Sequence, residues 1–329
     1  MQKKKRLSLF LAVLLCMLAL TGCQSGTANA DTKNGAVKKR IVCTTFPTYD
    51  WTREILGTHL EDFELTLLLD KGGDLHSYQP TAGDIATMIS ADLFVYVGGE
   101  SDEWVTEVLK NAHNQEMRVV NLMETLGDAV KEEETVRGIA AQRHEHDSDE
   151  EEYDEHVWLS LKNASVLTKT LSDNIKQLDE ANAEDYAANE KAYLAQLTAL
   201  DDAYADAVRE AKKKTILFGD RFPFRYMTDD YGLDYYAAFT GCSTETDASF
   251  ETITFLSGKM DELELPAILT IEGSNQRIAE IIKQNTRDKN QEILTMNSLQ
   301  SVTAKDIEGG FTYLKAMQDN LEVLKKAMN

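Results

Sequence analysis

The strongest constraint on the fold of this chain is a long stretch without helix breakers. Residues 183–212 contain neither Gly nor Pro and are rich in Ala, Leu, Glu and Lys. As a continuous α-helix this stretch would be roughly 45 Å long, about the diameter of a domain. The helical pattern begins earlier, at Leu161, and continues with little interruption to about Lys213. We therefore expect a rigid helical strut with a folded part on each side of it.

Short β-prone runs alternate with helical patterns on both sides of this strut. Strand-like runs occupy residues 41–46, 63–69, 92–97, 118–122, 215–218, 235–239, 267–271 and 292–296. Helical patterns occupy residues 49–56, 82–90, 101–110, 223–231, 248–260, 275–285 and 309–328. Strands that alternate with helices indicate parallel sheets covered by helices on both faces. The sequence thus predicts an α/β protein with a sheet in each half.

The charge balance limits the class of partner. The 329 residues include 34 basic and 56 acidic side chains, a formal net charge of −22, while 43% of residues are hydrophobic. The hydrophobic fraction and the length suit two domains. Nucleic-acid binding needs clustered Lys and Arg, so we expect no nucleic-acid partner.

The N-terminus predicts export and a membrane anchor. Basic residues 3–6 precede an apolar run, residues 9–20, which is too short to span a membrane comfortably. The segment Leu20-Thr21-Gly22-Cys23 resembles a bacterial lipobox, which implies cleavage before Cys23 and a lipid on its sulfur. The alternative is an ordinary signal peptide with an incidental Cys. We expect residues 1–22 to be a signal peptide, residues 23–37 a lipidated flexible tether, and the mature protein to lie on the extracytoplasmic face of the cell membrane.

The histidines are the most informative side chains. All six lie at or before residue 156. His76 follows the second predicted strand and a glycine pair, at the sheet edge where open α/β sheets bind ligands. His156 precedes a short apolar run, residues 157–159, that should fix its backbone. Imidazole is a good ligand for Zn²⁺ and related cations, so both are candidate metal ligands.

An acidic, histidine-containing stretch lies directly before His156. Residues 144–155 hold two further His and eight carboxylates. One interpretation is a solvated acidic loop, because so many like charges repel one another. We favour an accessory loop that raises the local concentration of cations beside a tighter site. Its candidate residues are His144, His146, Asp147 and Asp149.

Four segments together carry a family resemblance. Residues 75–81 (LHSYQPT), 91–99 (ADLFVYVGG), 155–160 (EHVWLS) and 224–233 (FRYMTDDYGL) resemble, in order and spacing, segments of the zinc and manganese solute-binding lipoproteins of ABC importers. The resemblance runs from about residue 39 to the end of the chain. An acidic His-containing loop before the second metal His is the feature that distinguishes zinc members of that family.

The resemblance implies an architecture and two ligands. We expect two Rossmann-like lobes with parallel sheets, bridged by one long α-helix, with a metal site in the cleft between the lobes. The expected boundaries are an N-terminal lobe at 38–182 with the acidic loop at 131–155, a linking helix at 183–213 and a C-terminal lobe at 214–329. The two His ligands that the first lobe supplies in this family correspond to His76 and His156.

The chain departs from the family pattern in the second lobe. Arg221 stands where the resemblance leads us to expect a His or Glu ligand, and Arg cannot ligate a cation. We predict Asp220 as the third ligand, the alternative being an Asp–Arg ion pair at a surface or hinge. Glu272 is the candidate fourth ligand, with water as its alternative. A site with two His and a carboxylate suits Zn(II) and also Mn(II).

Two further cysteines have no single interpretation. Cys43 and Cys242 both lie at the ends of predicted strands that the fold would bring near the expected cleft. A disulfide, a soft metal ligand that favours zinc, or buried free thiols all fit the sequence. These three alternatives remain open at this stage.

The function that the resemblance implies is metal transport rather than catalysis. We expect a monomer that captures Zn(II), or Mn(II), and delivers it to an ABC permease with its ATPase, held at the membrane by its lipid. The alternative is a metal-dependent hydrolase built on the same His₂–carboxylate site. No zinc-protease helix motif and no GxSxG elbow is present in the sequence, so we expect no enzyme. A surface adhesin role is a secondary expectation.

Overall fold

The first half of the chain forms a four-stranded parallel sheet. The computed structural model describes residues 38–112, 114–133, 152–243 and 247–329. The sheet order is β2-β1-β3-β4, with every neighbouring pair parallel. Its elements are β1 (Lys39–Cys43), α2 (Phe46–Leu56), η1 (Gly57–Asp62), β2 (Phe63–Leu67), η2 (Leu75–Ser77), α3 (Ala82–Ile89), β3 (Leu93–Tyr96), η3 (Glu100–Asp102), α4 (Trp104–Leu109), β4 (Arg118–Asn121), α5 (Leu122–Leu126), η4 (Gly127–Ala129) and η5 (Val157–Leu159).

The second half repeats this plan. Its sheet has the order β6-β5-β7-β8, again parallel throughout. The elements are β5 (Thr215–Phe222), α8 (Arg225–Tyr231), β6 (Asp234–Thr240), α9 (Phe250–Leu263), β7 (Ala267–Ile271), α10 (Arg277–Asn285), β8 (Glu292–Met296), α11 (Ala304–Glu308) and α12 (Tyr313–Ala327). The α/β class with two parallel sheets is therefore confirmed.

Two long helices connect the sheets. α6 (Leu161–Leu178) and α7 (Ala183–Glu210) are separated by the short turn η6 (Glu180–Asn182). Helical geometry ends at Asp179, whose carboxylate accepts hydrogen bonds from Asn182 and from the Tyr186 hydroxyl. A short Asp side chain that bonds to local groups in this way competes with helix continuation. The expected helical stretch therefore consists of two helices, of which α7 is the long one.

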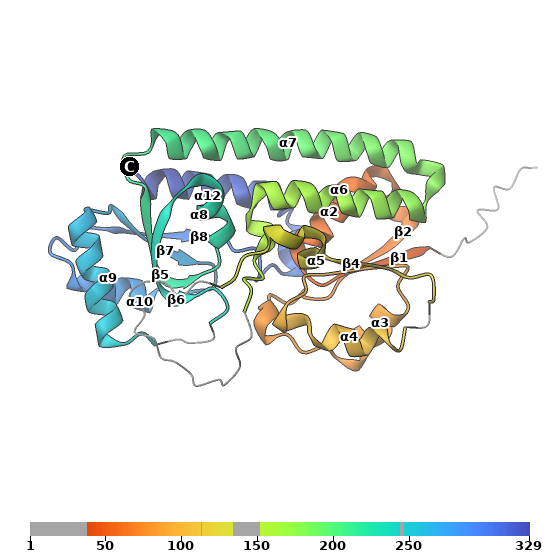
Figure 1. Cartoon of the computed structure of the whole chain (residues 1–329), viewed down its shortest axis with the longest axis horizontal. Coiled ribbons are helices and arrows are strands. Elements are labelled where there is room, and N and C mark those ends of the chain that lie inside the picture. The colour runs from red at the N-terminus through yellow and green to blue at the C-terminus, as the bar shows by residue number, and fades with distance from the viewer. Residues whose placement is uncertain (1–37, 113, 134–151, 244–246) are drawn as a thin grey trace, which may run out of the picture. The chain divides into compact units, whose positions relative to one another are not determined.

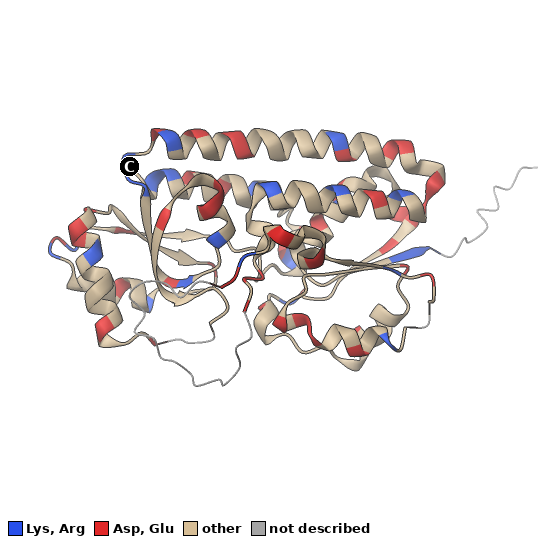
Figure 2. Ribbon diagram, in the orientation of Figure 1, with Lys and Arg blue, Asp and Glu red and all other residues tan. Residues whose placement is uncertain are grey.

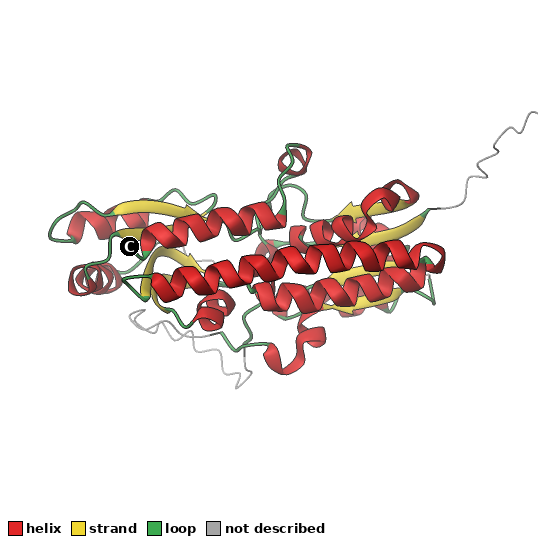
Figure 3. Cartoon of the chain, turned by 90° about the horizontal axis from the view of Figure 1, so that it is seen from above, coloured by secondary structure: helices red, strands yellow, loops and turns green. Residues whose placement is uncertain are grey.

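α7 contacts both halves of the molecule. It packs against α2 and α6 of the first half and against α8 and α12 of the second. Figures 1 and 3 show α6, α7 and α12 running along the same face of the two sheets. Buried side chains of α7 include Tyr193, Leu197 and Tyr204, and the Tyr204 hydroxyl donates to the carbonyl of Met317 on α12. The long helix is thus fixed to both halves by packing and by a buried hydrogen bond.

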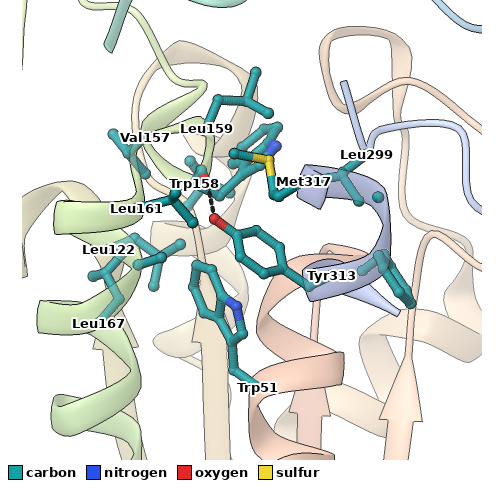
Figure 4. Close-up of a cluster of buried hydrophobic side chains, with 14 of the residues drawn as sticks. Trp51, Leu122, Val157, Trp158, Leu159, Leu161, Leu167, Leu299, Tyr313 and Met317 are labelled. Atoms are coloured by element: carbon teal, nitrogen blue, oxygen red, sulfur yellow. Dashed lines mark hydrogen bonds between the residues drawn. The ribbon is translucent and has the colours of Figure 1, made fainter. Parts of the chain in front are cut away.

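A hydrophobic core continues from one half into the other. Trp51 of α2 packs edge-on against Tyr313 of α12, with 5.1 Å between ring centroids. The Tyr313 hydroxyl donates to the Trp158 carbonyl, and Trp158 Nε1 donates to the Ser298 carbonyl. Figure 4 shows these rings among buried Leu and Val side chains. Because Trp158 lies two residues after His156, this core holds the backbone on which that histidine lies.

Charged residues are spread over the described helices (Figure 2). Over the described residues, no helix has the length and apolar character needed to cross a bilayer. Acidic and basic residues are interspersed along α6, α7 and α12 (Figure 2). The signal segment and Cys23 lie outside the described residues.

The sheet order determines where a ligand site is expected. In each sheet the strand order reverses beside the first strand, between β1 and β3 and between β5 and β7. The carboxyl ends of strands at such a reversal form the usual ligand crevice of open α/β sheets. β5 carries an irregularity there, because its register with β6 shifts between Phe218 and Arg221. β5 therefore departs from regular strand geometry at the end that meets the first half.

Candidate metal centre

The two predicted histidine ligands lie in loops that begin in the same way. His76 lies in η2, beyond the carboxyl end of β2, and His156 immediately precedes η5. Two residues before each is an Asp, and Oδ1 of Asp74 and of Asp154 accepts the backbone N–H of the following His at 3.0 and 2.8 Å. This local Asp bond is a known turn-forming contact. The pattern Asp-x-His thus fixes the backbone of both candidate ligands.

The Nδ1 atoms of both imidazoles face carboxylates. His156 Nδ1 lies 3.0 Å from Asp154 Oδ1. His76 Nδ1 lies 2.9 Å from Ser101 Oγ and 3.2 Å from Glu155 Oε2. A carboxylate only accepts hydrogen bonds, so it favours the tautomer with the proton on Nδ1. That tautomer leaves the Nε2 lone pair available to a cation, as in many carboxylate–histidine–zinc sites.

The two Nε2 atoms face each other at 3.1 Å. With both protons on Nδ1, this arrangement would bring two lone pairs together, so the pair needs a proton or a cation between the rings. Two nitrogen ligands at 2.0–2.1 Å from a tetrahedral Zn²⁺ are about 3.3 Å apart. The observed separation is close to that value, and both side chains are nearly or fully buried. The pair is therefore already arranged as two ligands of one ion.

A thiol from the second half completes the cluster. The ligand atoms of His76, His156 and Cys242 all lie within 4.8 Å of one another, the one such group among the described residues. Cys242 lies two residues after β6, and its backbone N–H donates to Glu133 Oε1. A Cβ on Gly241 would lie 3.1 Å from the His156 ring and 2.9 Å from the Phe222 carbonyl. The absence of that atom lets the chain bring Cys242 to the histidines.

Burial and nearby carboxylates together shift the pKa values of two groups in the cluster. Burial lowers the pKa of His156, but the charge and hydrogen bond of Asp154 outweigh it and raise that pKa above its usual value. Burial, followed by the charges of Glu133, Asp154 and Glu155, raises the pKa of the Cys242 thiol. The carboxylates that contribute to both shifts favour positive charge, which a bound divalent cation would supply.

Arg221 is oriented toward a carboxylate of the first half. Its Nη1 donates to Asp74 Oδ2 at 2.6 Å. Burial raises the pKa of Asp74, but the charges of Arg221 and His76 and their hydrogen bonds outweigh this and lower it. The residue that replaces the expected ligand thus clamps the loop of His76 instead of contacting a cation.

The two predicted carboxylate ligands lie in other contacts. Asp220 accepts the backbone N–H of Arg221 through Oδ1 and that of Ile271 through Oδ2, at 2.9 and 3.3 Å. Both oxygens of Glu272 are bonded by Ser298, from its N–H and its hydroxyl, at 2.7 Å each. Neither belongs to the described cluster around His76. Their roles as third and fourth ligands stay predictions.

The cluster borders an open hollow of about 360 Å³ between the two halves. Its lining includes Asp74, His76, Asp220, Arg221, Ser243 and Asn275. His76 therefore has a route to solvent, whereas His156 is fully buried. An ion would reach the cluster from the His76 side.

The accessory loop residues lie outside the described part of the chain. His144, His146, Asp147 and Asp149 fall within residues 134–151. The flanks are described: the Glu133 N–H donates to the Glu152 carbonyl at 2.7 Å, and the Asp154 N–H to the Lys131 carbonyl at 2.8 Å. The described residues on either side of this segment, Glu133 and Glu152, are therefore adjacent in the fold, and Glu152 shortly precedes His156.

The cysteines are distinguished by position. Both are free thiols, and Cys43 is fully buried on β1 with Sγ 3.8 Å from Thr52 Oγ1.

Sequence reasoning also overlooked the residues that orient the histidines: Asp74, Ser101, Asp154 and Glu155. The repeated Asp-x-His spacing was a signal for Asp74 and Asp154. Ser101 and Glu155 are brought to His76 by the fold, and no local pattern marks them.

Comparison with known proteins identifies the family of the chain. The family model described as zinc-uptake complex component A, periplasmic, matches residues 41–327. The zinc-binding lipoprotein AdcA of Streptococcus pneumoniae is 30% identical over 98% of this chain, which spans 61% of that relative. The high-affinity zinc uptake system protein ZnuA of Bacillus subtilis is 26% identical over 98% of both chains.

A solved structure shows the same architecture. The Zn(II)-bound ZnuA-like domain of Streptococcus pneumoniae AdcA superimposes with a TM-score of 0.68 at 26% identity, covering 88% of this chain and 99% of that domain. The chain therefore corresponds to the ZnuA-like part of AdcA, about three-fifths of that protein.

Proposed function

The chain belongs to the family of periplasmic zinc-uptake components, and from this premise we propose that it captures Zn(II) outside the cytoplasm and delivers it to an ABC permease with its ATPase. Mn(II) is the alternative cargo. The observation that carries the proposal is the opposed pair of His76 and His156 Nε2 atoms, 3.1 Å apart, with each Nδ1 facing a carboxylate. Such a pair binds a borderline cation strongly.

The fold supports capture and release rather than catalysis. The site lies where the two halves meet and borders an open hollow, so small movements between the halves would change the ligand geometry. Zinc-binding relatives favour transport over a hydrolase. We propose a non-enzymatic, monomeric carrier, held on the extracytoplasmic face of the membrane by a lipid on Cys23. An adhesin role stays a prediction.

Removal of the histidines tests this function. His76→Ala and His156→Ala should each lower Zn(II) affinity at least about a hundredfold, measured by competition with a chelator of known affinity. His59→Ala is the matched control, because His59 pairs with Asp62 and Asp185 away from the cluster. In a strain whose zinc uptake depends on this protein, the two site variants should fail to restore growth on limiting zinc. Equal affinity in all three variants and the parent protein would overturn the proposal.

A further inference from the structure

We propose that Cys242 Sγ is the third protein ligand of the ion that His76 and His156 bind, so that the second half contributes a thiolate where an imidazole or carboxylate was expected. This inference rests on the function proposed above. It assigns the site a nitrogen–nitrogen–sulfur donor set, which selects Zn(II) over Mn(II).

The other candidates of the second half are engaged elsewhere. Arg221 cannot ligate and is bonded to Asp74. Asp220 accepts two backbone N–H groups, and Glu272 accepts both donors of Ser298. Cys242 is the one second-half side chain, among those described, whose ligand atom joins the two histidines.

The geometry of the thiol is compatible with a tetrahedral ion. With Zn–S near 2.3 Å and Zn–N near 2.0–2.1 Å, sulfur and nitrogen ligands are about 3.6 Å apart. The three ligand atoms lie within 4.8 Å before any ion draws them together. Two independent constraints hold the thiol there: the close passage of Gly241 against His156 and the bond from the Cys242 N–H to Glu133.

The donor set has a consequence for selectivity. Thiolate binds Zn(II) and Cd(II) much better than it binds Mn(II), which prefers oxygen ligands. Arg221 supplies no ligand of its own, and a thiolate from two residues beyond β6 provides a third strong one. The carboxylates near the thiol, among them Glu133 and Glu155, add attraction for the cation without taking part in the cluster.

Cobalt(II) reports the ligand directly. The purified, metal-stripped full-length chain is titrated with Co(II), which replaces Zn(II) in tetrahedral sites and absorbs strongly when a thiolate is bound. We expect an intense sulfur-to-cobalt charge-transfer band that saturates at one equivalent. The band should vanish in Cys242→Ser and Cys242→Ala and persist in Cys43→Ser, the matched thiol control. If the band persists in both Cys242 variants, or is absent from the parent protein, the assignment is overturned.

Affinity measurements distinguish a failure of this inference from a failure of the proposed carrier function. Cys242→Ala should lower Zn(II) affinity about ten- to a hundredfold and Mn(II) affinity less than about threefold. Asp220→Asn should leave the cobalt band intact. If the parent protein binds Zn(II) tightly in a way that depends on His76 but shows no thiolate band with Co(II), Cys242 is not a ligand. The proposed carrier function would then still stand. Absence of tight, His76-dependent zinc binding in the parent protein would refute the function itself.

A second measurement guards against misfolding of the variants. In the unaltered protein, one equivalent of Zn(II) should slow alkylation of Cys242 by iodoacetamide at least about tenfold, followed by peptide mass spectrometry. His156→Ala should abolish this protection. Equal alkylation with and without Zn(II), under conditions where the metal is bound, would contradict ligation by the thiol.

Discussion

Arg221 Nη1 on β5 donates to Asp74 Oδ2 over 2.6 Å, while Asp74 Oδ1 accepts the backbone N–H of His76. One carboxylate thus joins β5 of the second half to the first-half loop that carries His76. Arg221, at the position where the sequence led us to expect a ligand, instead holds the first-half loop through this ion pair.

The strength of this clamp is measurable in the metal-free protein. Arg221→Met leaves the Asp74 carboxylate, 20% exposed, without its partner and should lower the free energy of unfolding by about 1–3 kcal/mol. Asp74→Asn combined with Arg221→Met should cost less than the sum of the single changes by about 1 kcal/mol. Urea unfolding of the parent protein, the two single variants and the double variant gives this double-mutant cycle. As a control, Arg277→Met breaks an exposed pair with Asp247 and should change stability by less than about 0.5 kcal/mol.

The orientation of His156 gives the next prediction. Asp154→Asn keeps an acceptor for the His156 N–H but removes the charge that faces Nδ1 at 3.0 Å. Loss of such a partner typically lowers metal affinity ten- to a hundredfold, and we expect Zn(II) affinity to fall by about that factor while the fold is retained. Competition titration measures it. Glu152→Gln, an exposed carboxylate two residues earlier, should leave the affinity within about twofold. A comparable loss in both variants would mean that net charge, not orientation, is responsible.

The sequence was a good guide to the fold because its signals are local. Strands and helices such as 267–271 and 277–285 lie within a few residues of their expected positions, since apolar runs, Gly and Pro mark them. His76 and His156 were predicted as ligands from their positions and from the resemblance, and the fold brings their rings together. The contact of Cys242 with them depends on how β6 ends beside a loop of the other half, and no single-sequence pattern encodes that. The same holds for Arg221. The sequence excluded it as a metal ligand because it is an arginine, but only the fold shows that it pairs with Asp74.

The flanks of the acidic segment allow a clean test of its role. Glu133 and Glu152 are joined by a backbone hydrogen bond of 2.7 Å, so residues 134–151 are replaceable by a short Gly-Ser linker that keeps Asp154 in place. We expect the tight zinc equivalent to persist with affinity within about threefold, and any weaker equivalents to disappear. Isothermal titration calorimetry measures both classes. Loss of the tight equivalent, in a protein that still unfolds cooperatively, would place the main site in the deleted segment. A deletion that extended through Asp154 would remove an orienting carboxylate and confuse the two outcomes.

A buried carboxyl beside the site gives a prediction for pH. Asp102 is 2% exposed, and its Oδ2 accepts the N–H groups of Val97 and Gly98. Burial, only partly offset by these bonds, raises the pKa of Asp102 to about 7. Between about pH 4 and about pH 7 the folded protein therefore keeps a proton that the unfolded chain has released. The contribution of this group to stability is fully present below about pH 4 and is lost as the pH rises toward 7.

Asp102→Asn removes this titration and keeps an acceptor for both N–H groups. The free energy of unfolding of the variant should therefore increase relative to that of the unaltered protein as the pH rises, by at most about 1.4 kcal/mol per pH unit. Urea unfolding in the presence of a chelator, at several values between about pH 4.5 and about pH 7.5, measures the difference. The chelator is needed because bound metal would add its own dependence on pH. Parallel curves for the two proteins would show that Asp102 is ionised in the folded state throughout this range, with its burial compensated by the bonds to Val97 and Gly98.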